Sequence, residues 1–312
     1  MNSLGIFAAP GKARARGLVL QLVALCEAAK IPVCLPISWA RQIERPELGA
    51  PDETVASRDA LVVFSGDGGI LAAARAAAPF GTPILGVDLG RLGFLSSVRP
   101  EELESAFHML REGAFETEER LMLNARVLRR RESMEGQGTP CEIGPRSIIG
   151  ANYCEVGGSL GLNDAVVAKS ALARILRLNI YVEGELVAAV RADGLVISTP
   201  TGSTAYALSA GGPIVHPGVP LLLMCPICAH TLMLRPLVVG PDETVEILAE
   251  WEGDEVAPGQ LHAMLTVDGQ IGFELKSGDI VRVRRDPTVA RLLVAPGDGF
   301  YSRLRQKLRW GD

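Results

Sequence analysis

A glycine-rich turn with an aspartate at its centre is the first segment whose residue types suggest chemistry. The sequence Ser-Gly-Asp-Gly-Gly at residues 65–69 follows the apolar run Leu61–Phe64 and precedes a segment with helical spacing. Glycines between a strand and a helix let backbone N–H groups approach a phosphate, and the helix N-terminus adds partial positive charge. Gly66, Gly68 and Gly69 are therefore candidate phosphate-binding residues.

The aspartate in this turn, Asp67, is the candidate catalytic residue. A carboxylate repels phosphate, so its presence here is explained if it contacts a hydroxyl nucleophile or a metal ion. A tight turn that carries an aspartate for conformational reasons is the alternative interpretation.

A second polar segment follows another apolar run. Residues 193–206 read Asp-Gly-Leu-Val-Ile-Ser-Thr-Pro-Thr-Gly-Ser-Thr-Ala-Tyr. A strand that ends in small hydroxyl residues around Pro and Gly offers several short donors and acceptors, which suits a polar ligand lying against the backbone. A helix cap explains two of these hydroxyls but not all of them.

The elements before residue 116 alternate between strand-like and helix-like runs, which predicts an α/β domain. No periodicity is visible in residues 41–55, which we expect to be irregular. Strands are predicted at 4–8, 31–35, 61–64 and 83–87, and helices at 13–29, 70–78 and 100–111.

From Leu121 onward, alternating runs separated by turn signals predict an antiparallel, sandwich-like β domain. Residues 129–161 are polar, Gly-rich and without pattern, which predicts a long loop or insertion. Residues 301–310 predict a helix that docks by Leu304 and Leu308. The predicted strands are 121–128, 178–182, 186–190, 195–199, 221–227, 244–248, 261–267 and 280–284.

Composition excludes several classes of function. With 312 residues and a net charge of −5, nothing favours nucleic acid or an anionic membrane as a partner. No apolar run reaches the roughly 18 residues that span a bilayer, and no signal-peptide pattern opens the chain, so we expect a cytoplasmic protein. Cys225 and Cys228 with His230 could be a metal or redox motif, but no second pair completes a zinc site, and a buried strand running into a turn is the preferred interpretation.

The segments described above, in their order and spacing, resemble the NAD kinases. The resemblance rests on the Gly-Asp-Gly loop, the pair Asn163-Asp164, the run 193–206 and the stretch 209–217, and extends to residues 226–228, 235–238 and 267–270. It covers nearly the whole chain apart from residues 129–161. The Gly-Asp-Gly element alone is shared with lipid kinases and phosphofructokinases.

The resemblance implies a fold and a set of site residues. An N-terminal, Rossmann-like α/β domain of the GDG-kinase type (1–115) would be joined to a β-rich NAD-binding domain (116–287), with residues 288–312 returning to the first domain and NAD between the two. Asp67 would contact the acceptor 2′-hydroxyl. The implied NAD-binding residues, with Arg191 added because it precedes Asp193 by two positions, are Gly68, Asn163, Asp164, Arg191, Asp193, Thr201, Thr204, Ala205, Tyr206, Ser209 and Gln270.

Four positions depart from the family pattern. The family usually has Gly-Gly-Asp-Gly-Thr, whereas this chain has Ser65 first and Gly69 last, and the hydroxyl lost at 69 would weaken binding of the triphosphate. Asp88 stands where Asn is usual, and Asp164 replaces Glu, which shortens its reach.

The expected activity is transfer of a phosphoryl group from ATP to the 2′-hydroxyl of NAD's adenosine ribose, giving NADP. A divalent cation, Mg²⁺, would bridge oxygens of the phosphoryl donor. The sequence does not identify the protein ligands of this cation. The partners would be NAD and ATP, in a homodimer or homotetramer. Two alternatives stay open, a lipid or sugar kinase that shares the loop and a non-catalytic NAD-binding regulator, as do the phosphoryl donor (ATP, another triphosphate or polyphosphate) and the choice between NAD and NADH.

Overall fold

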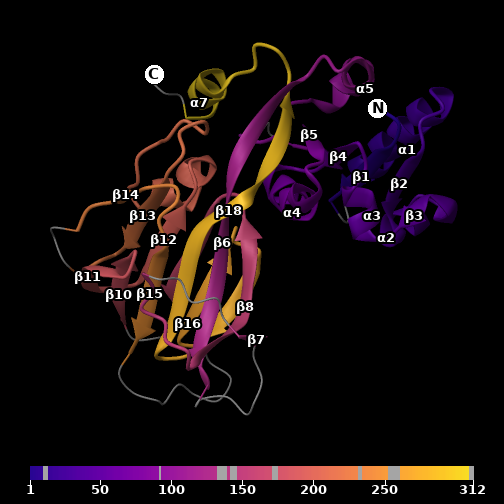
Figure 1. Cartoon of the computed structure of the whole chain (residues 1–312). Helices are drawn as coiled ribbons and strands as arrows, with labels where there is room; N and C mark the ends of the chain where they lie inside the picture. The colour runs from indigo at the N-terminus through magenta and orange to yellow at the C-terminus, as the bar shows by residue number, and fades with distance from the viewer. Residues whose placement is uncertain are drawn as a thin grey trace. The chain divides into compact units, whose positions relative to one another are not determined.

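Two compact units make up the chain. The computed structural model describes residues 1–9, 13–90, 93–131, 139–140, 146–170, 175–230, 234–251 and 261–308. Unit 1 comprises residues 1–120 and 288–312, and unit 2 comprises residues 121–287 (Figure 1). Two long strands, β6 (Glu116–Arg130) and β18 (Asp279–Val294), have residues in both units.

Unit 1 is built on a parallel sheet in the order β3-β2-β1-β4-β5, with Arg291 and Leu292 of β18 beside β5. This is the order of a Rossmann-like, doubly wound domain, in which ligands bind at the carboxyl edge where the strand order reverses. Here the reversal lies between β1 and β4. The strands are β1 (Leu4–Ala8), β2 (Val33–Pro36), β3 (Gly49–Ala50), β4 (Ala60–Phe64) and β5 (Pro83–Val87).

Helices cover both faces of this sheet because alternate side chains of a strand point to opposite faces. Helices α1 and α5 pack on one face of the sheet and form an apolar cluster with its residues Leu4, Ile6, Val62 and Phe64. Helices α3 and α4 also contact the strands, but their residues do not belong to that cluster. The helices are α1 (Ala13–Ala28), α2 (Ile37–Gln42), α3 (Asp52–Ala56), α4 (Asp67–Ala77), α5 (Leu103–Glu112) and α7 (Phe300–Leu308), with 3-10 turns at Pro46–Leu48, Ala78–Phe80 and Pro100–Glu102.

The expectation that residues 41–55 are irregular is wrong. The segment contains the end of α2, a 3-10 turn, β3 and α3. Each element is too short to show a period, and each is held by tertiary contacts instead, since Ile43 and Val55 are buried. Local pattern therefore carries little information where elements span only one turn.

Unit 2 is a sandwich of two antiparallel sheets, as predicted. The first runs β11-β10-β15-β18, with β6, β8 and β7 joined to it, and the second runs β14-β13-β12-β9-β16-β17. Alternate residues of both sheets, such as Leu123, Leu195 and Leu265, form one apolar core. The strands are β7 (Thr139–Pro140), β8 (Tyr153–Gly161), β9 (Asp164–Lys169), β10 (Leu176–Val182), β11 (Glu185–Ala192), β12 (Gly194–Ser198), β13 (Leu222–Ile227), β14 (Leu237–Val239), β15 (Val245–Glu250), β16 (Ala263–Val267) and β17 (Ile271–Leu275).

The prediction of a long loop over residues 129–161 is wrong at both of its ends. Arg129 and Arg130 finish β6, and Tyr153–Gly161 forms β8, which pairs antiparallel with β6. The sequence of β8 is Gly-rich, so its strand propensity is low. Pairing with β6 overrides that weakness. Residues 132–138 and 141–145 lie outside the described residues.

Two further predicted elements, the buried strand that contains Cys225 and the C-terminal helix, are present. Cys225 lies on β13 among buried apolar side chains, and burial raises the pKa of its thiol to about 11. The predicted C-terminal helix is present as α7, with Leu304 buried and Leu308 partly exposed. Within the described part of the chain, every helix is too short or too polar to cross a membrane.

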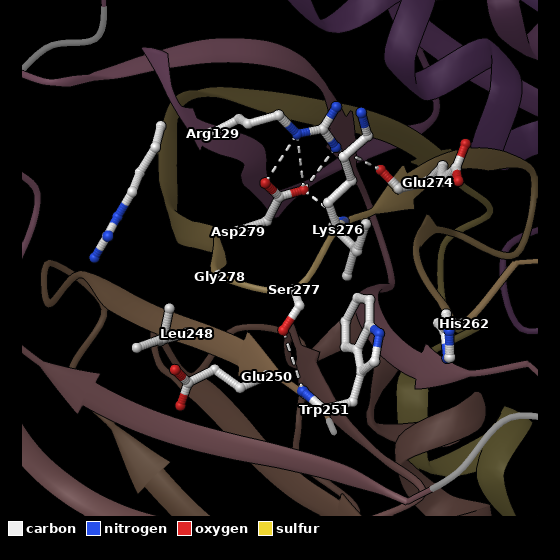
Figure 2. Close-up of a pocket in the computed structure, with 12 residues that line it drawn as sticks. Arg129, Leu248, Glu250, Trp251, His262, Glu274, Lys276, Ser277, Gly278 and Asp279 are labelled. Carbon is white, nitrogen blue, oxygen red and sulfur yellow. Dashed lines mark hydrogen bonds and ion pairs between the residues drawn. The ribbon is translucent and has the colours of Figure 1, made fainter. Parts of the chain in front are cut away.

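A buried ion pair ties the end of β6 to the start of β18. Arg129 donates from Nε to Asp279 Oδ1 (2.9 Å) and from Nη2 to Asp279 Oδ2 (2.7 Å). Asp279 is 2% exposed, and the backbone N–H of Lys276 also donates to it. These residues line a polar pocket of about 570 Å³, where Trp251 stacks on His262 (Figure 2).

We predict that Arg129→Met destabilises the protein by about 3 to 5 kcal/mol, because it leaves the Asp279 carboxylate buried without its cation. In a unit of this size the melting temperature should fall by roughly 6 to 20 °C in a thermal unfolding scan. The control is Arg285→Met, which removes an exposed pair with Asp242 (3.6 Å) and should cost less than about 1 kcal/mol. An equal fall of the melting temperature in the two variants would contradict the conclusion that the buried pair of Arg129 and Asp279 stabilises the protein.

Candidate active site

Asp67 holds the connection that follows the neighbouring strand. It is the first residue of α4, at the carboxyl end of β4. Its Oδ2 accepts the backbone N–H of Phe94 (2.8 Å), and its Oδ1 accepts that of Leu95 (3.1 Å). Each carboxylate oxygen has a second lone pair, so Asp67 can still accept a hydrogen bond from a ligand hydroxyl.

This contact requires a glycine at position 93. A Cβ on Gly93 would overlap the carboxylate of Asp67. The Gly93 N–H donates to Ser96 Oγ (2.9 Å), which closes the loop on itself. Gly93 thus lets this backbone segment come within hydrogen-bonding distance of the aspartate.

The two departures at Ser65 and Gly69 explain one another. A Cβ on Gly69 would overlap both Oγ and Cβ of Ser65. Rotation of the serine moves its Oγ but cannot move its Cβ, so residue 69 has no room for a side chain while residue 65 has one. The Ser65 side chain therefore occupies the space that a side chain at position 69 would need.

The first turn of α4 begins at an extended Gly66. The N–H groups of Gly69 and Ile70 both donate to the Gly66 carbonyl (3.0 and 3.4 Å). The helix N-terminus, with its partial positive charge, therefore lies at Asp67 and Gly68.

Asp88 follows β5 and is buried. Its Oδ1 accepts the N–H of Gly90 (2.9 Å), and its Oδ2 has no partner among the described residues. The replacement of the family's asparagine by Asp88 has no explanation in these contacts.

In unit 2, Asp268 organises the segment that contains Asn163 and Asp164. Its Oδ1 accepts the N–H groups of Asn163 (2.7 Å) and Asp164 (3.3 Å), and its Oδ2 accepts that of Leu162 (3.1 Å). Its own N–H donates to the Asp164 carbonyl (2.9 Å). Asp268 was not among the candidate site residues, although the Asp-Gly turn between two strands was a signal for it.

Most of the hydroxyls at the end of β12 and in the segment after it bind backbone. Ser198 Oγ donates to Asn163 O (3.2 Å), Thr199 Oγ1 to Leu162 O (2.5 Å), and Ser203 Oγ to the carbonyl of Pro200. Thr204 Oγ1 also donates to the Thr201 carbonyl (3.4 Å), so four hydroxyls of the run bind backbone. Thr201 Oγ1, in contrast, is buried with no partner among the described residues.

Asp164 is a buried carboxyl group with a displaced pKa. It is 4% exposed. Burial, with the nearby charge of Asp268, raises its pKa to about 7, against the opposing effect of a hydrogen bond from the Tyr206 N–H. At neutral pH this carboxyl is therefore divided between its charged and neutral forms.

The candidate residues of unit 2 separate into two groups. Asp164 pairs with Ser198 at one end of the β9–β12 ladder, and Asp193 adjoins Lys169 at the other, about 17 Å away at the usual rise of a strand. Asp193 is ion-paired with Lys169 (3.6 Å) and not with Arg191, which is exposed. The group at the Asp164 end consists of Asn163, Asp164, Thr201, Thr204, Ala205, Tyr206, Ser209 and Gln270.

The described residues contain no group of three or more His, Cys, Asp or Glu side chains that could hold a metal ion.

The exclusion between positions 65 and 69 gives a testable prediction. Gly69→Thr should lower the melting temperature by several degrees, because overpacking at this site costs about 1 to 3 kcal/mol. The double variant Ser65→Gly/Gly69→Thr should recover it, and Ser65→Gly alone is the matched control. Additive effects in this cycle would show that the two positions do not share space.

The pKa of Asp164 gives a second prediction. Its folded value of about 7 exceeds its ordinary value of 3.8, so the stability it contributes is full below pH 3.8 and is lost as pH rises through about 7. Asp164→Asn removes this titration. Its melting temperature relative to the parent should rise between about pH 5 and 7 and then level off, by at most the equivalent of about 4 kcal/mol. A difference that is constant between about pH 5 and 8 would contradict the raised pKa.

Comparison with known proteins identifies the family. The model of the ATP-NAD kinase N-terminal domain matches residues 30–115, and that of the C-terminal domain matches residues 162–294. An NAD kinase of Moorella thermoacetica is 39% identical over 311 residues, covering 100% of this chain and 90% of the relative. An NAD kinase of Aquifex aeolicus is 41% identical over 279 residues, covering 89% and 90%.

Solved structures agree in fold. A yeast NADH kinase complexed with NADH has a TM-score of 0.81 at 24% identity, covering 100% of this chain and 88% of that one. An NAD kinase from Archaeoglobus fulgidus in complex with ATP has a TM-score of 0.69 at 22% identity and covers 98% of each chain. On the strength of the curated relatives and the two domain matches, this chain belongs to the ATP–NAD kinase family.

Proposed function

We propose that this protein phosphorylates the 2′-hydroxyl of the adenosine ribose of NAD with ATP, giving NADP. The observation that carries the proposal is the Asp67 carboxylate, held by two backbone N–H groups at the carboxyl end of β4 and at the N-terminus of α4. A fixed acceptor for a hydroxyl beside a helix N-terminus suits phosphoryl transfer, which depends on positioning and charge neutralisation more than on covalent help.

Asp67 would orient the attacking hydroxyl and receive its proton. As the new O–P bond forms, the hydroxyl becomes acidic and its proton passes to the free lone pair of the carboxylate, while the O–P bond to the ADP leaving group breaks. The contacts with Phe94 and Leu95 limit rotation of the carboxylate, so the acceptor is oriented before the substrate binds.

The NAD-binding residues of unit 2 would be the group at the Asp164 end. Within this group, Thr201 offers a hydroxyl with no partner among the described residues, and Asp164 offers a carboxyl. Asp193 and Arg191 would contact a different part of the dinucleotide, since they lie about one strand length away.

The phosphates would bind at the first turn of α4, where Gly66, Gly68 and Gly69 form the backbone. A divalent cation, Mg²⁺, would neutralise charge on the transferred phosphoryl group. Mg²⁺ in such sites keeps several waters and takes phosphate oxygens with one or two carboxylates. The described residues offer no cluster of three or more acidic, His or Cys side chains for it, so nucleotide oxygens and water would supply most of its ligands.

We extend the proposal to a cytoplasmic homodimer or homotetramer. Leu237 and Val238 on β14, an edge strand, are 43% and 55% exposed. Exposed apolar side chains on an unpaired strand edge are typical of surfaces that another chain covers.

We predict that Asp67→Asn lowers NADP formation by at least about 100-fold, because it removes the proton acceptor. The measurement couples NADP to an NADP-specific dehydrogenase in the presence of ATP, Mg²⁺ and NAD. NAD binding, followed by calorimetry, should be retained. Since the new amide group would face a backbone N–H, the melting temperature of the variant is measured alongside.

The outcomes separate the alternatives. Loss of NAD binding in the variant would make Asp67 a primary ligand contact. A parent protein that binds NAD but makes no NADP with ATP or polyphosphate, from NAD or NADH, would favour the non-catalytic binding protein. Phosphorylation of a lipid or sugar without NADP formation would favour the other GDG-type kinases.

A further inference from the structure

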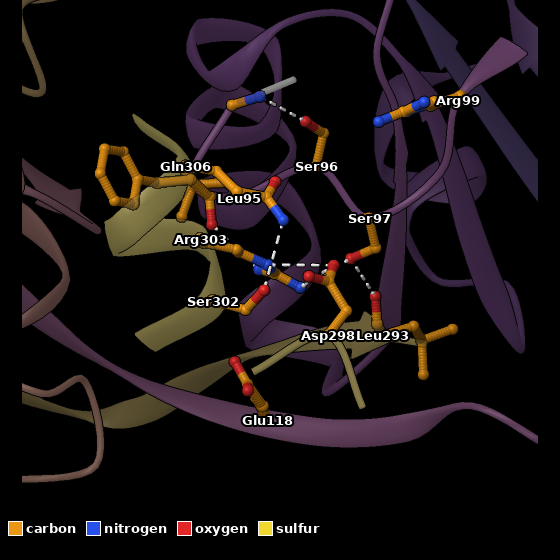
Figure 3. A network of polar contacts seen from close by, with 12 residues as sticks. Leu95, Ser96, Ser97, Arg99, Glu118, Leu293, Asp298, Ser302, Arg303 and Gln306 are labelled. Carbon is orange, nitrogen blue, oxygen red and sulfur yellow. Dashed lines mark hydrogen bonds and ion pairs between the residues drawn. The ribbon is translucent and has the colours of Figure 1, made fainter. Parts of the chain in front are cut away.

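The C-terminal helix of unit 1 buries an arginine. Arg303 on α7 is 3% exposed, although the helix around it is basic and mostly exposed. Its guanidinium extends into the space bounded by Ser97 and Asp298 (Figure 3). Apolar docking through Leu304 was expected from the sequence, but a buried charge was not.

The guanidinium is held from one side and binds the active-site loop on the other. Nε and Nη2 donate to Asp298 Oδ2 (3.1 and 3.0 Å), which fixes the side chain. Nη1 donates to the Phe94 carbonyl (3.0 Å), and Nη2 lies 3.4 Å from Ser97 Oγ. Ser97 Oγ in turn donates to the Leu293 carbonyl (2.8 Å) at the end of β18.

The peptide group between Phe94 and Leu95 joins Arg303 to Asp67. Its carbonyl accepts from Arg303, and its N–H, which belongs to Leu95, donates to Asp67 Oδ1. A peptide group is planar and rigid, so a hydrogen bond at one edge restricts the direction of the other. A cation on the carbonyl also polarises the group and strengthens its N–H as a donor.

Burying this arginine has an electrostatic cost, which its ion pair with Asp298 opposes. A second guanidinium, that of Arg120, is buried in the same unit and paired with Glu118. Burial is the main cause that lowers the pKa of Arg120, and the charge of Arg303 lowers it further. Two like charges in one interior are unfavourable, so Arg303 is held there by its directed contacts.

We infer that Arg303 is a positioning residue for phosphoryl transfer: through the Phe94–Leu95 peptide group, it fixes the orientation of the Asp67 carboxylate. The inference rests on the proposed function, because Asp67 must be the acceptor for its orientation to matter. A displacement of about 1 Å in a reacting group can reduce a rate about 100-fold.

The first test separates positioning from stability. Arg303→Met removes the contact with Phe94, and Arg303→Lys keeps the charge but cannot reach Asp298 and the carbonyl together. Both should lower kcat about 10- to 100-fold, with the KM values for NAD and ATP within about threefold of the parent. Arg303→Lys also serves if Arg303→Met does not fold.

Two variants are the controls. Asp298→Asn weakens the buried pair but leaves an oxygen to hold Arg303, so it should lower the melting temperature and spare kcat. Arg305→Met removes an exposed charge from the same helix and should change neither. The inference is overturned if Arg303→Met keeps the parental kcat, or if Asp298→Asn loses as much kcat as Arg303→Met at an equal loss of melting temperature.

A second readout does not depend on activity. Amide hydrogen exchange at Phe94 and Leu95 should accelerate in both Arg303 variants, because Asp67 then holds those N–H groups less well, while a peptide covering residues 194–198 of unit 2 should not change. Unchanged exchange at Phe94 and Leu95 overturns the inference. If the parent protein makes no NADP, the proposed function fails, and the exchange result still decides whether Arg303 fixes the loop.

Discussion

The structure around the candidate site depends on one interaction, the acceptance of two backbone N–H groups by a single carboxylate. Loops after neighbouring parallel strands come together at the carboxyl edge of the sheet, and their polar backbone groups need partners there. Asp67 provides both. The close approach explains why residue 93 has no side chain. The same residue that would do the chemistry is thus also the residue that keeps its own surroundings in place.

Unit 2 uses the same device at a different point. Asp268 collects three N–H groups from the segment that leads into β9, which fixes the backbone at Asn163 and Asp164. The consequence is a second carboxyl group next to the first, in a place with little water. The raised pKa of Asp164 follows from this arrangement and from burial. The hydrogen bonds that fix this backbone thus also make the Asp164 carboxyl harder to ionise.

Much of the architecture could be predicted from local patterns. β4 is five buried apolar residues in a row, and the strands of the sandwich alternate, so both kinds could be located from the sequence. The Gly-Asp-Gly loop indicates Asp67 as a candidate site residue, the resemblance to the NAD kinases adds Asn163 and Asp164, and their roles stay predictions.

What could not be predicted depends on partners distant in sequence. β8 is a strand because β6 pairs with it, and α3 is a helix because it packs on the sheet. From the sequence alone, Arg303 is one more basic residue of a solvated helix. Its partner, the carbonyl of Phe94, lies 209 residues earlier in the chain. Asp268 has the same character, since its three N–H donors lie more than 100 residues before it. Local pattern cannot report contacts of this range.

The division of unit 1 into two stretches of chain has a consequence for biosynthesis. Residues 1–120 emerge from the ribosome first, and the residues of unit 2 follow. Only afterwards do the residues emerge that form the end of β18, beside β5, and the helix α7, which contacts the loop after β5. At about 5 to 20 residues per second, the backbone of Phe94 emerges roughly 10 to 40 s before Arg303. During that interval the nascent chain contains Asp67 and the loop with Phe94 but does not yet contain Arg303. A chain released early by a stalled ribosome would therefore carry the motif but not its support, and competence for the reaction would be acquired only after Arg303 has been added.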